Sequence, residues 1–311
     1  MNKEDESLAQ SLSDVADVDV FNNPDIAHIF IHHHKVVRSH DVPGLKIDVE
    51  EKEDHVKVKV VIEKDTEIEH PVHMCFGMMI QEGEQHLVMD ITAEENSSVS
   101  ILAHCAFPKA TDLKHVMDAE INIGKNASYS YFERHIHGKS GGVKVVPKAD
   151  IYLDENARFY TEFELLKGRA GVIDIDYETQ CEKNSVLEMV TRINAKGDDV
   201  VKIKEIGHLN GDRSKGFLNS RVAAREKAKA EVYNKLTASG AYARGHVDCK
   251  EIIKDDGVVS AIPIVEVSNP KAHITHEASL GSVDSKQLQT LMSRGLSEDE
   301  ATELIIQGLL S

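Results

Sequence analysis

The chain has 311 residues, of which 41% are hydrophobic and 29% are charged, and its formal net charge at pH 7 is −17. This composition is typical of a globular protein that is long enough to bury a large core. The acidic balance argues against nucleic acid and membrane surfaces as partners, because a protein of net negative charge cannot displace the counterions that surround them.

Residues 1–40 are predicted to form a loose N-terminal segment that is partly helical. The chain does not start with a basic region followed by an apolar run, and no stretch has the roughly 18 apolar residues that a membrane span requires. Four cysteines lie far apart, without a CxxC pair: Cys75, Cys105, Cys181 and Cys249. These observations predict a cytoplasmic protein whose cysteines are reduced.

Residues 41–279 are predicted to form a β-solenoid, a stack of coils that complete each other's core. Apolar and polar residues alternate with period two, and turn residues interrupt the runs at short intervals. An asparagine followed by alanine or serine recurs in the turns at steps of 30, 30 and 28 residues, at Asn96, Asn126, Asn156 and Asn184. Ala228 and Ala272 mark looser copies. Asparagine suits such turns because it tolerates a left-handed backbone. An antiparallel sandwich remains the alternative.

Residues 280–311 are predicted to form two short amphipathic helices. Asp284 is placed to cap the first helix, and Gly295 to end it. Ser297 and Glu300 form a capping box for the second. The helices either pack on the end of the solenoid or bind a partner. Their apolar positions are the candidate partner-binding residues: Leu288, Leu291, Met292, Leu304, Ile305 and Leu309.

The cysteines divide into two groups. Strand parity predicts that Cys105 and Cys181 face the core, and Cys75 lies in an apolar run, so all three are interpreted as small buried hydrophobic residues. Sulfur transfer through Cys105 or Cys181 is the alternative. Cys249 has polar neighbours on both sides, which favours an exposed thiolate more than at the other three. A single cysteine in a strand is nevertheless more often structural.

Several histidines are candidate metal ligands. His135 and His137 form an HxH pair on one strand face, similar to the first metal motif of cupins. His276 and Glu277 are adjacent, so a regular strand would direct them to opposite faces. The chain contains no GxxxxGK[ST], GxGxxG, GxSxG or HExxH motif, so any ATP that the function requires must be bound by another subunit.

The C-terminal 70 residues resemble the SufB/SufD family of iron–sulfur cluster assembly scaffolds. The resemblance rests on the segments DCKEII, PIVEV and HEAS, followed by QLQTLMSRGLSEDEATELIIQG. Because the chain reads HEA and not HGA, it is more similar to the SufB branch. It is short for that branch and lacks its longer N-terminal part, as in a compact archaeal-type form. The sulfur-accepting cysteine of the family has no matching motif here.

The resemblance implies a mainly β fold, a right-handed parallel β-helix core with a small C-terminal helical region. It implies that two SufB/SufD-like subunits pair, here as a homodimer, and that the helical region binds a SufC-like ABC-type ATPase. A transient iron–sulfur cluster, most simply a [4Fe-4S] cluster, would be built at the subunit interface on Cys249, His276 and Glu277 and passed to apo-proteins. The chain would then be a scaffold and not an enzyme. A cupin-like metal enzyme using the HxH pair and a metal-free interaction protein remain alternatives.

Overall fold

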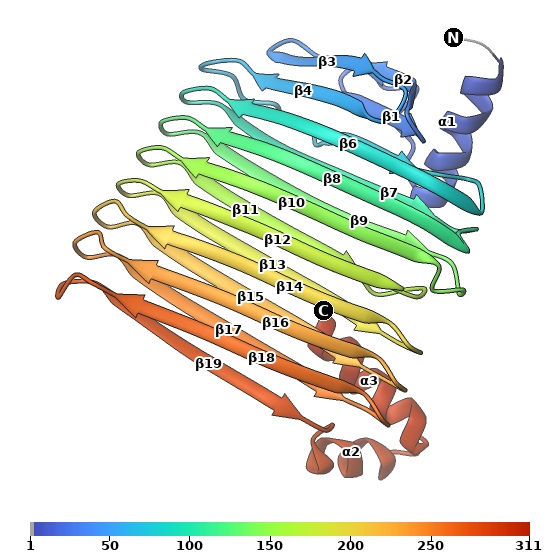
Figure 1. Ribbon diagram of the computed structural model, residues 1–311, viewed down its shortest axis with the longest axis vertical. Helices are drawn as coiled ribbons and strands as arrows, with labels where there is room; N and C mark the ends of the chain where they lie inside the picture. The colour runs from blue at the N-terminus through green and yellow to red at the C-terminus, as the bar shows by residue number, and fades with distance from the viewer. Residues whose placement is uncertain (1–2) are drawn as a thin grey trace.

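The computed structural model describes residues 3–311, which form three helices and nineteen strands (Figure 1). The helices are α1 (Lys3–Ala16), α2 (Ser285–Met292) and α3 (Glu298–Leu310). Sheet A contains β1 (His28–His32), β2 (Lys35–His40), β5 (Val72–Gly77), β7 (Ser98–Phe107), β9 (Ser128–His137), β11 (Arg158–Leu165), β13 (Val186–Ala195), β15 (Lys215–Ala224), β17 (Arg244–Ile253) and β19 (His273–Gly281). Sheet B contains β3 (Leu45–Glu51), β4 (Val56–Ile62), β6 (Glu82–Ala93), β8 (Asp112–Ile123), β10 (Val143–Leu153), β12 (Val172–Cys181), β14 (Val200–Leu209), β16 (Lys229–Ala238) and β18 (Val258–Val267).

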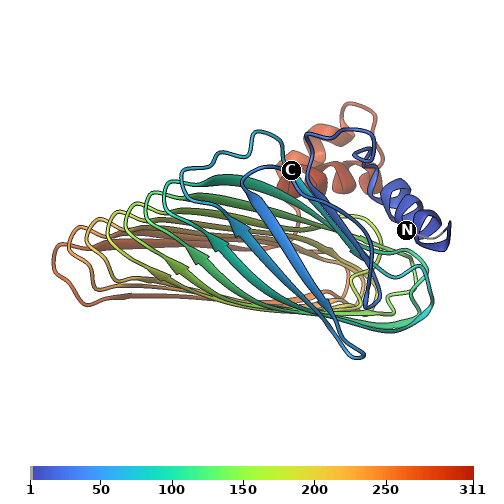
Figure 2. The same cartoon turned by 90° about the horizontal axis from the view of Figure 1, so that it is seen from above.

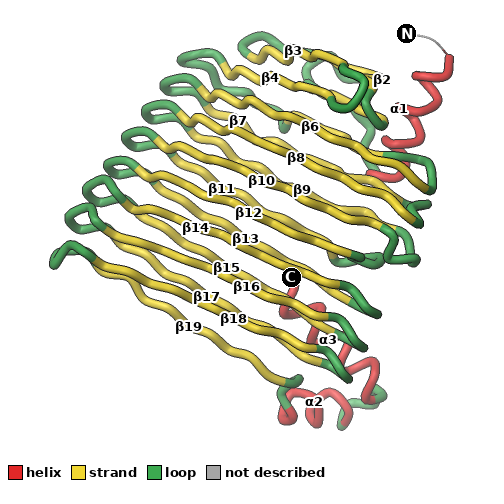
Figure 3. The backbone as a smooth tube through the Cα atoms, in the orientation of Figure 1, coloured by secondary structure: helices red, strands yellow, loops and turns green. Residues whose placement is uncertain are grey.

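The two sheets form a parallel β-solenoid, because from β4 onward the chain alternates between sheet B and sheet A (Figures 1 and 3). Each strand pairs in parallel with the strand one coil earlier, and β13 and β15 are in register along ten residue pairs. The pairs β1–β2 and β3–β4 are antiparallel and lie at the N-terminal end. The predicted solenoid is therefore confirmed, and the antiparallel sandwich is excluded.

The predicted asparagine turns join sheet B to sheet A at one edge of the solenoid, on the left in Figure 1. Asn96, Asn126, Asn156 and Asn184 all have positive φ, between 57° and 63°. Their side chains form a ladder in which the amide of each residue donates to the side-chain oxygen of the preceding one, over 2.8–3.0 Å. Each step of the repeat therefore contributes a turn and a rung of this ladder.

One of the two looser copies of the repeat, at Ala228, does not lie at the edge that contains the asparagine turns. Ala272 lies in the turn before β19 and continues the asparagine series, but Ala228 lies between β15 and β16, at the opposite edge. The series continues instead at Arg213 and Tyr242, whose φ values are 59° and 62°. Alanine spacing was misleading because both edges contain tight turns with a small residue after the left-handed one.

The core fills the lumen between the two sheets. Along β12, for example, buried and partly exposed residues alternate without exception, so every second side chain faces the lumen. The same parity places Cys105, Cys181 and Cys249 in one continuous apolar cluster, together with residues from all central coils. Burial of alternate residues is the physical basis of the period-two pattern in the sequence.

The helices lie outside the solenoid, on the same side of it (Figure 2). Helix α1 covers the outer face of sheet A near the N-terminal end, where its Leu12 shares an apolar cluster with Cys75. Helix α3 packs on the outer face of the same sheet, with Ile306 and Leu310 against Ala223. Within residues 3–311, no helix is long and apolar enough to cross a membrane.

The C-terminal end of the solenoid is open. Strands β18 and β19 are the last in their sheets, so each has a neighbouring strand on one side alone within the described chain. Residues that continue the lumen face into these strands, such as Val259 and Ile274, are partly exposed. The C-terminal helices therefore pack on the flank of the solenoid and do not cover its end, contrary to one of the two expectations for them.

Candidate functional site

Cys249 lies in β17, one coil from the open end, and its side chain points into the lumen. The residue is fully buried, and burial raises the pKa of its thiol to about 11. The expectation of an exposed thiolate was therefore wrong. Its charged neighbours Asp248 and Lys250 have the opposite strand parity and lie on the outer face, so they do not stabilise a thiolate in the lumen.

Polar side chains accompany Cys249 inside the lumen. The amide group of Asn234 is 3.8 Å from its Sγ. Glu251, two residues along the same strand, accepts a hydrogen bond from the hydroxyl of Ser220 at 3.1 Å. Glu205 of β14 also faces the lumen and accepts a hydrogen bond from Thr191 at 2.6 Å. Burial raises the pKa values of Glu205 and Glu251 to about 7. These residues were missed because acidic residues in strands normally face solvent.

His276 and Glu277 lie on the terminal strand β19, and the register directs them to opposite faces. His276 pairs with Val247, which faces the lumen like Cys249, whereas Glu277 pairs with Asp248 on the outer face. Both residues are exposed. Within one chain, His276 therefore lies on the same face of sheet A as Cys249, and Glu277 lies on the opposite face.

Glu277 belongs to a different group on the outer face. Its carboxylate, a ring nitrogen of His246 and a carboxylate oxygen of Asp248 lie within 4.8 Å of one another. Asp248 already accepts hydrogen bonds from Arg221 at 2.7 Å and Lys250 at 3.2 Å. Burial acts to raise the pKa of Asp248, but these two cations outweigh it and lower the pKa. Their charge makes this group less suited to a cation than its composition suggests.

The C-terminal helices form a groove that is lined by both apolar and polar side chains. Asp284 caps α2 by accepting from the backbone N–H of Gln287 at 2.7 Å, and Ser297 and Glu300 form the predicted capping box of α3. All six candidate partner-binding residues are at least partly exposed. The groove between the two helices is lined by Asp284, Lys286, Gln287, Thr290, Leu291, Leu304 and Ile305.

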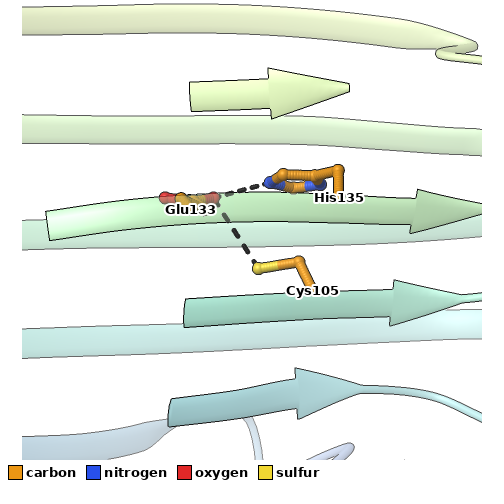
Figure 4. A group of neighbouring side chains, drawn as sticks. All are labelled: Cys105, Glu133 and His135. Atoms are coloured by element: carbon orange, nitrogen blue, oxygen red, sulfur yellow. Dashed lines mark hydrogen bonds and ion pairs between the residues drawn. The ribbon is translucent and has the colours of Figure 1, made fainter. Parts of the chain in front are cut away.

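A second group of polar side chains lies in the lumen near β7, six strand spacings along sheet A from the terminal strand β19 (Figure 4). Cys105 of β7, with Glu133 and His135 of β9, offers three ligand atoms within 4.8 Å of one another, and all three residues are buried. Glu133 Oε1 is 3.6 Å from Cys105 Sγ and 2.6 Å from His135 Nε2. Cys105 is core-facing, as predicted, but it is not surrounded by hydrocarbon alone.

Sequence reasoning missed this group, although the repeat contained the signal for it. Cys105 and His135 are 30 residues apart, which is one coil, and they are direct neighbours in the sheet. His115 of the opposite sheet also points inward, with Nε2 3.7 Å from Cys105 Sγ. Burial raises the pKa of Cys105 well above the usual value and lowers that of His115 well below it.

The HxH pair does not form a cupin-like site. His135 and His137 are both buried, and they contact each other through His135 Nδ1 and His137 Nε2 at 3.2 Å. The other nitrogen of His137 is 2.9 Å from the carbonyl oxygen of Arg169. Burial lowers the pKa of His137 to about 3. Since both of its nitrogens are engaged with other groups, His137 supports His135 and does not itself face a ligand.

The remaining cysteines are buried, as expected. Cys181 faces the lumen, and burial raises its pKa to about 12. Cys75 is buried between sheet A and α1, outside the lumen, so its core position is not the one that the sequence suggested. Because Cys181 lacks the carboxylate and imidazole contacts of Cys105, it serves as a comparison for both other lumen thiols.

Comparison with known proteins places these features in a family. A family model described as "SUF system FeS cluster assembly, SufBD core domain" matches residues 78–309. An iron–sulfur cluster assembly SufBD family protein of Methanocaldococcus jannaschii is 42% identical over 267 residues, which are 86% of this chain and 84% of that protein. A SufBD family protein of Pyrococcus horikoshii is 40% identical over 294 residues, which are 94% and 89% of the two chains.

More distant relatives are longer. A SufBD family protein of Staphylococcus epidermidis is 25% identical over 262 residues, which are 81% of this chain but 54% of that protein. The two more similar relatives described above match over 84% and 89% of their own length, and the family match includes both lumen groups and the helical tail. The chain therefore belongs to the SufBD family of iron–sulfur cluster assembly proteins.

Proposed function

We propose that this chain is a scaffold on which iron and sulfide assemble into a cluster near the open end of the solenoid. The observation that supports this most is the position of Cys249, which is the last fully buried thiol before the terminal strands with their free edges. Thiolate is the usual ligand of iron–sulfur clusters. The cluster is a product that leaves, so a small set of protein ligands suits it.

Two chains would supply the ligands together. Cys249 and His276 share the lumen-side parity of β17 and β19, so a two-fold pairing of open ends would bring two thiolates and two imidazoles to one interface. Glu277 would contribute from the outer face or across the interface. We propose a homodimer, because one chain carries the complete set, and a [4Fe-4S] cluster as its product.

The surface of the last coils supports such pairing. Among residues 3–311, nine large hydrophobic residues are strongly exposed, and four of them lie on β18 and β19: Val258, Ile262, Val267 and Leu280. The free edges of these strands also present unpaired backbone groups, which natural proteins normally cover. A second subunit at this end would cover the exposed hydrophobic residues and form hydrogen bonds with the unpaired backbone groups.

Access to Cys249 requires a conformational change. Its thiol is buried, and its raised pKa disfavours the thiolate that binds iron. We propose that an ABC-type ATPase like SufC supplies this change by docking in the groove between α2 and α3. Helix α3 is tied to the solenoid by an ion pair between Arg225 and Glu303 at 2.6 Å, so movement of the helices would reach sheet A directly. Completed clusters would pass to apo-proteins in the cytoplasm.

Anaerobic reconstitution tests the scaffold. Purified protein is incubated with ferrous iron and sulfide, with and without the ATPase and ATP, and the visible absorption of the cluster is measured. We expect a broad band in the wild type that is lost in Cys249→Ala. Cys181→Ala is the matched control, because it removes another lumen thiol and should leave the band intact. A band that persists in Cys249→Ala, or is absent from the wild type with ATPase and ATP, contradicts the proposal.

Deletion of residues 282–311 tests the ATPase surface separately. We expect the deleted protein to lose co-purification with the ATPase. Leu304→Asp in the full chain is the finer variant, because Leu304 is exposed and lines the groove. If both variants still bind the ATPase, its binding site lies outside the groove between α2 and α3.

A further inference from the structure

The buried group around Cys105 lies far from the proposed cluster site. Strand β7 is five strand spacings from β17 in sheet A, which corresponds to about 24 Å. The group also places several ionisable side chains in an apolar core, where packing does not require them. Burying a carboxylate is costly unless its partners satisfy it, yet Oε2 of Glu133 has no hydrogen-bond partner among the described residues.

Hydrogen bonding fixes where the protons lie in this group. The carbonyl oxygen of Arg169 can only accept, so Nδ1 of His137 carries a proton and donates to it. Nε2 of a neutral His137 then accepts from Nδ1 of His135. The lone pair of a neutral His135 is consequently on Nε2, which points at Glu133 Oε1 at 2.6 Å. Two acceptor atoms this close require a cation between them, either a proton or a metal ion.

This arrangement is typical of a metal ligand with its supporting shell. A histidine that binds a metal usually donates its other N–H to an acceptor, which fixes its tautomer and orientation. Here His137 is that acceptor, and the backbone of Arg169 fixes His137 in turn. The Sγ of Cys105 lies 3.6 Å from Glu133 Oε1, close to the edge of about 3.3–3.8 Å of a tetrahedron with zinc–ligand bonds of about 2.0–2.3 Å. The 2.6 Å contact would lengthen by several tenths of an ångström.

We propose that the lumen holds a divalent first-row transition-metal ion, zinc by its ligand set, bound by Cys105, Glu133 and His135. Nε2 of His115 is the nearest candidate for a fourth ligand, since it lies 3.7 Å from Cys105 Sγ. The mixture of sulfur, nitrogen and oxygen atoms favours zinc over magnesium or calcium.

The charges balance when the ion is bound. A thiolate and a carboxylate carry two negative charges, which one divalent cation neutralises, so the buried site has no net charge. Binding exchanges one metal ion for two protons, one from the Cys105 thiol and one that lies between Glu133 Oε1 and His135 Nε2. The bound ion would also give the unpaired Glu133 oxygen a nearby cation. The proposal is independent of cluster assembly at Cys249.

Metal content of the intact chain tests the proposal. The protein is produced in medium supplemented with zinc, so that the ion is present before the lumen closes, and zinc is measured by elemental mass spectrometry. We expect one zinc ion per chain in the wild type and loss of it in Cys105→Ala. Cys181→Ala and Cys249→Ala should both retain it, because neither thiol contacts Glu133 or His135.

Two further measurements keep the test decisive if Cys105→Ala folds poorly. Glu133→Gln preserves the shape of the side chain but removes its charge, and should also lose zinc while its circular dichroism stays that of the wild type. Protein produced with cobalt in place of zinc should show a thiolate-to-cobalt charge-transfer band. Substoichiometric metal in the wild type, or equal metal in the wild type and Glu133→Gln, would overturn the proposal and leave a shared proton in its place.

Discussion

The lumen thiols Cys105 and Cys249 lie in the same core, but the coils around them differ. Cys105 is enclosed by complete coils on both sides, and a carboxylate and two imidazoles surround it. Cys249 is just as buried, but the next coil is the last one and its strands have free edges. The middle of the solenoid is thus complete within one chain, whereas the last strands at its C-terminal end have free edges within the described chain.

The difference shows that burial alone does not define a role for a cysteine in this fold. Burial raises the pKa of both thiols, so neither is a ready thiolate in the isolated chain. In the middle coils a bound cation can stabilise the thiolate without movement. At the end, displacement of a single coil can expose it. Four predictions test this contrast, from the largest expected effect to the smallest.

Charges on the free strands should separate the subunits of the proposed homodimer. We expect the double variant Ile262→Asp and Leu280→Asp to weaken dimerisation by at least about 100-fold, because each carboxylate would lose its water at the interface. Sedimentation velocity over a range of concentrations measures this. Tyr152→Asp is the control, since Tyr152 is 42% exposed on a middle strand and should leave the dimer unchanged. Equal effects of both changes would mean that the end is not the interface.

Truncating a lumen-facing side chain should lower the free energy of unfolding more in the middle coils than in the last coil. Ile175 of β12 is fully buried, and Ile175→Ala should lower the free energy of unfolding by about 3 kcal/mol. Ile274 of β19 is partly exposed, and Ile274→Ala should cost about 1 kcal/mol or less. Both are measured by urea unfolding in the double variant described above, which is expected to be monomeric. Equal losses would show that the last coil is as tightly packed as the others.

The lumen carboxylates should make stability depend on pH. Burial raises the pKa of Glu205 to about 7 from 4.5, so the folded state holds a proton that the unfolded state has lost. Its contribution is fully present below about pH 4.5 and is lost as the pH rises through about 7. Glu205→Gln should remove the part of the pH dependence that Glu205 contributes and be more stable than the wild type at pH 8 by up to about 3 kcal/mol.

Unfolding in urea from pH 5 to pH 8 measures the effect of Glu205→Gln. Glu231→Gln is the control, because Glu231 is exposed on the outer face of the neighbouring strand β16. An unchanged slope in Glu205→Gln would mean that another group supplies the pH dependence.

The asparagine ladder should contribute a smaller amount at each rung. Asn126 has φ of 60° and hydrogen bonds to both Asn96 and Asn156. Asn126→Ala should lower the free energy of unfolding by about 1–2 kcal/mol, through backbone strain and the lost hydrogen bonds. Asn122→Ala, at an ordinary strand position, should change it by less than about 0.5 kcal/mol. If both changes have the same effect, the turn conformation does not depend on asparagine.

Much of the fold could be predicted because each coil repeats the same local rules. Alternation of apolar residues identified the strands, and the spacing of Asn96, Asn126 and Asn156 gave the coil length and the turns. The helix caps at Asp284 and Ser297 were also found, since they depend on contacts three residues apart. The assignment of Ala228 failed because small residues follow left-handed turns at both edges.

The sites were harder to predict because they depend on which face and which coil each residue occupies. Polar neighbours suggested an exposed Cys249, but they lie on the other face of the same strand. The group around Cys105 combines residues from three strands, and two of its members, Glu133 and His115, lie in sequence that gives no sign of a buried role.

The sequence by itself determined the family, the period of the coil and the turn chemistry, because these follow from neighbours along the chain. The tertiary structure decided which thiols share the lumen with carboxylates and imidazoles, and which end of the solenoid stays open. Those outcomes depend on stacking coils in register, which brings residues 28–31 positions apart into contact, and on the absence of a further coil beyond β19 within the described chain.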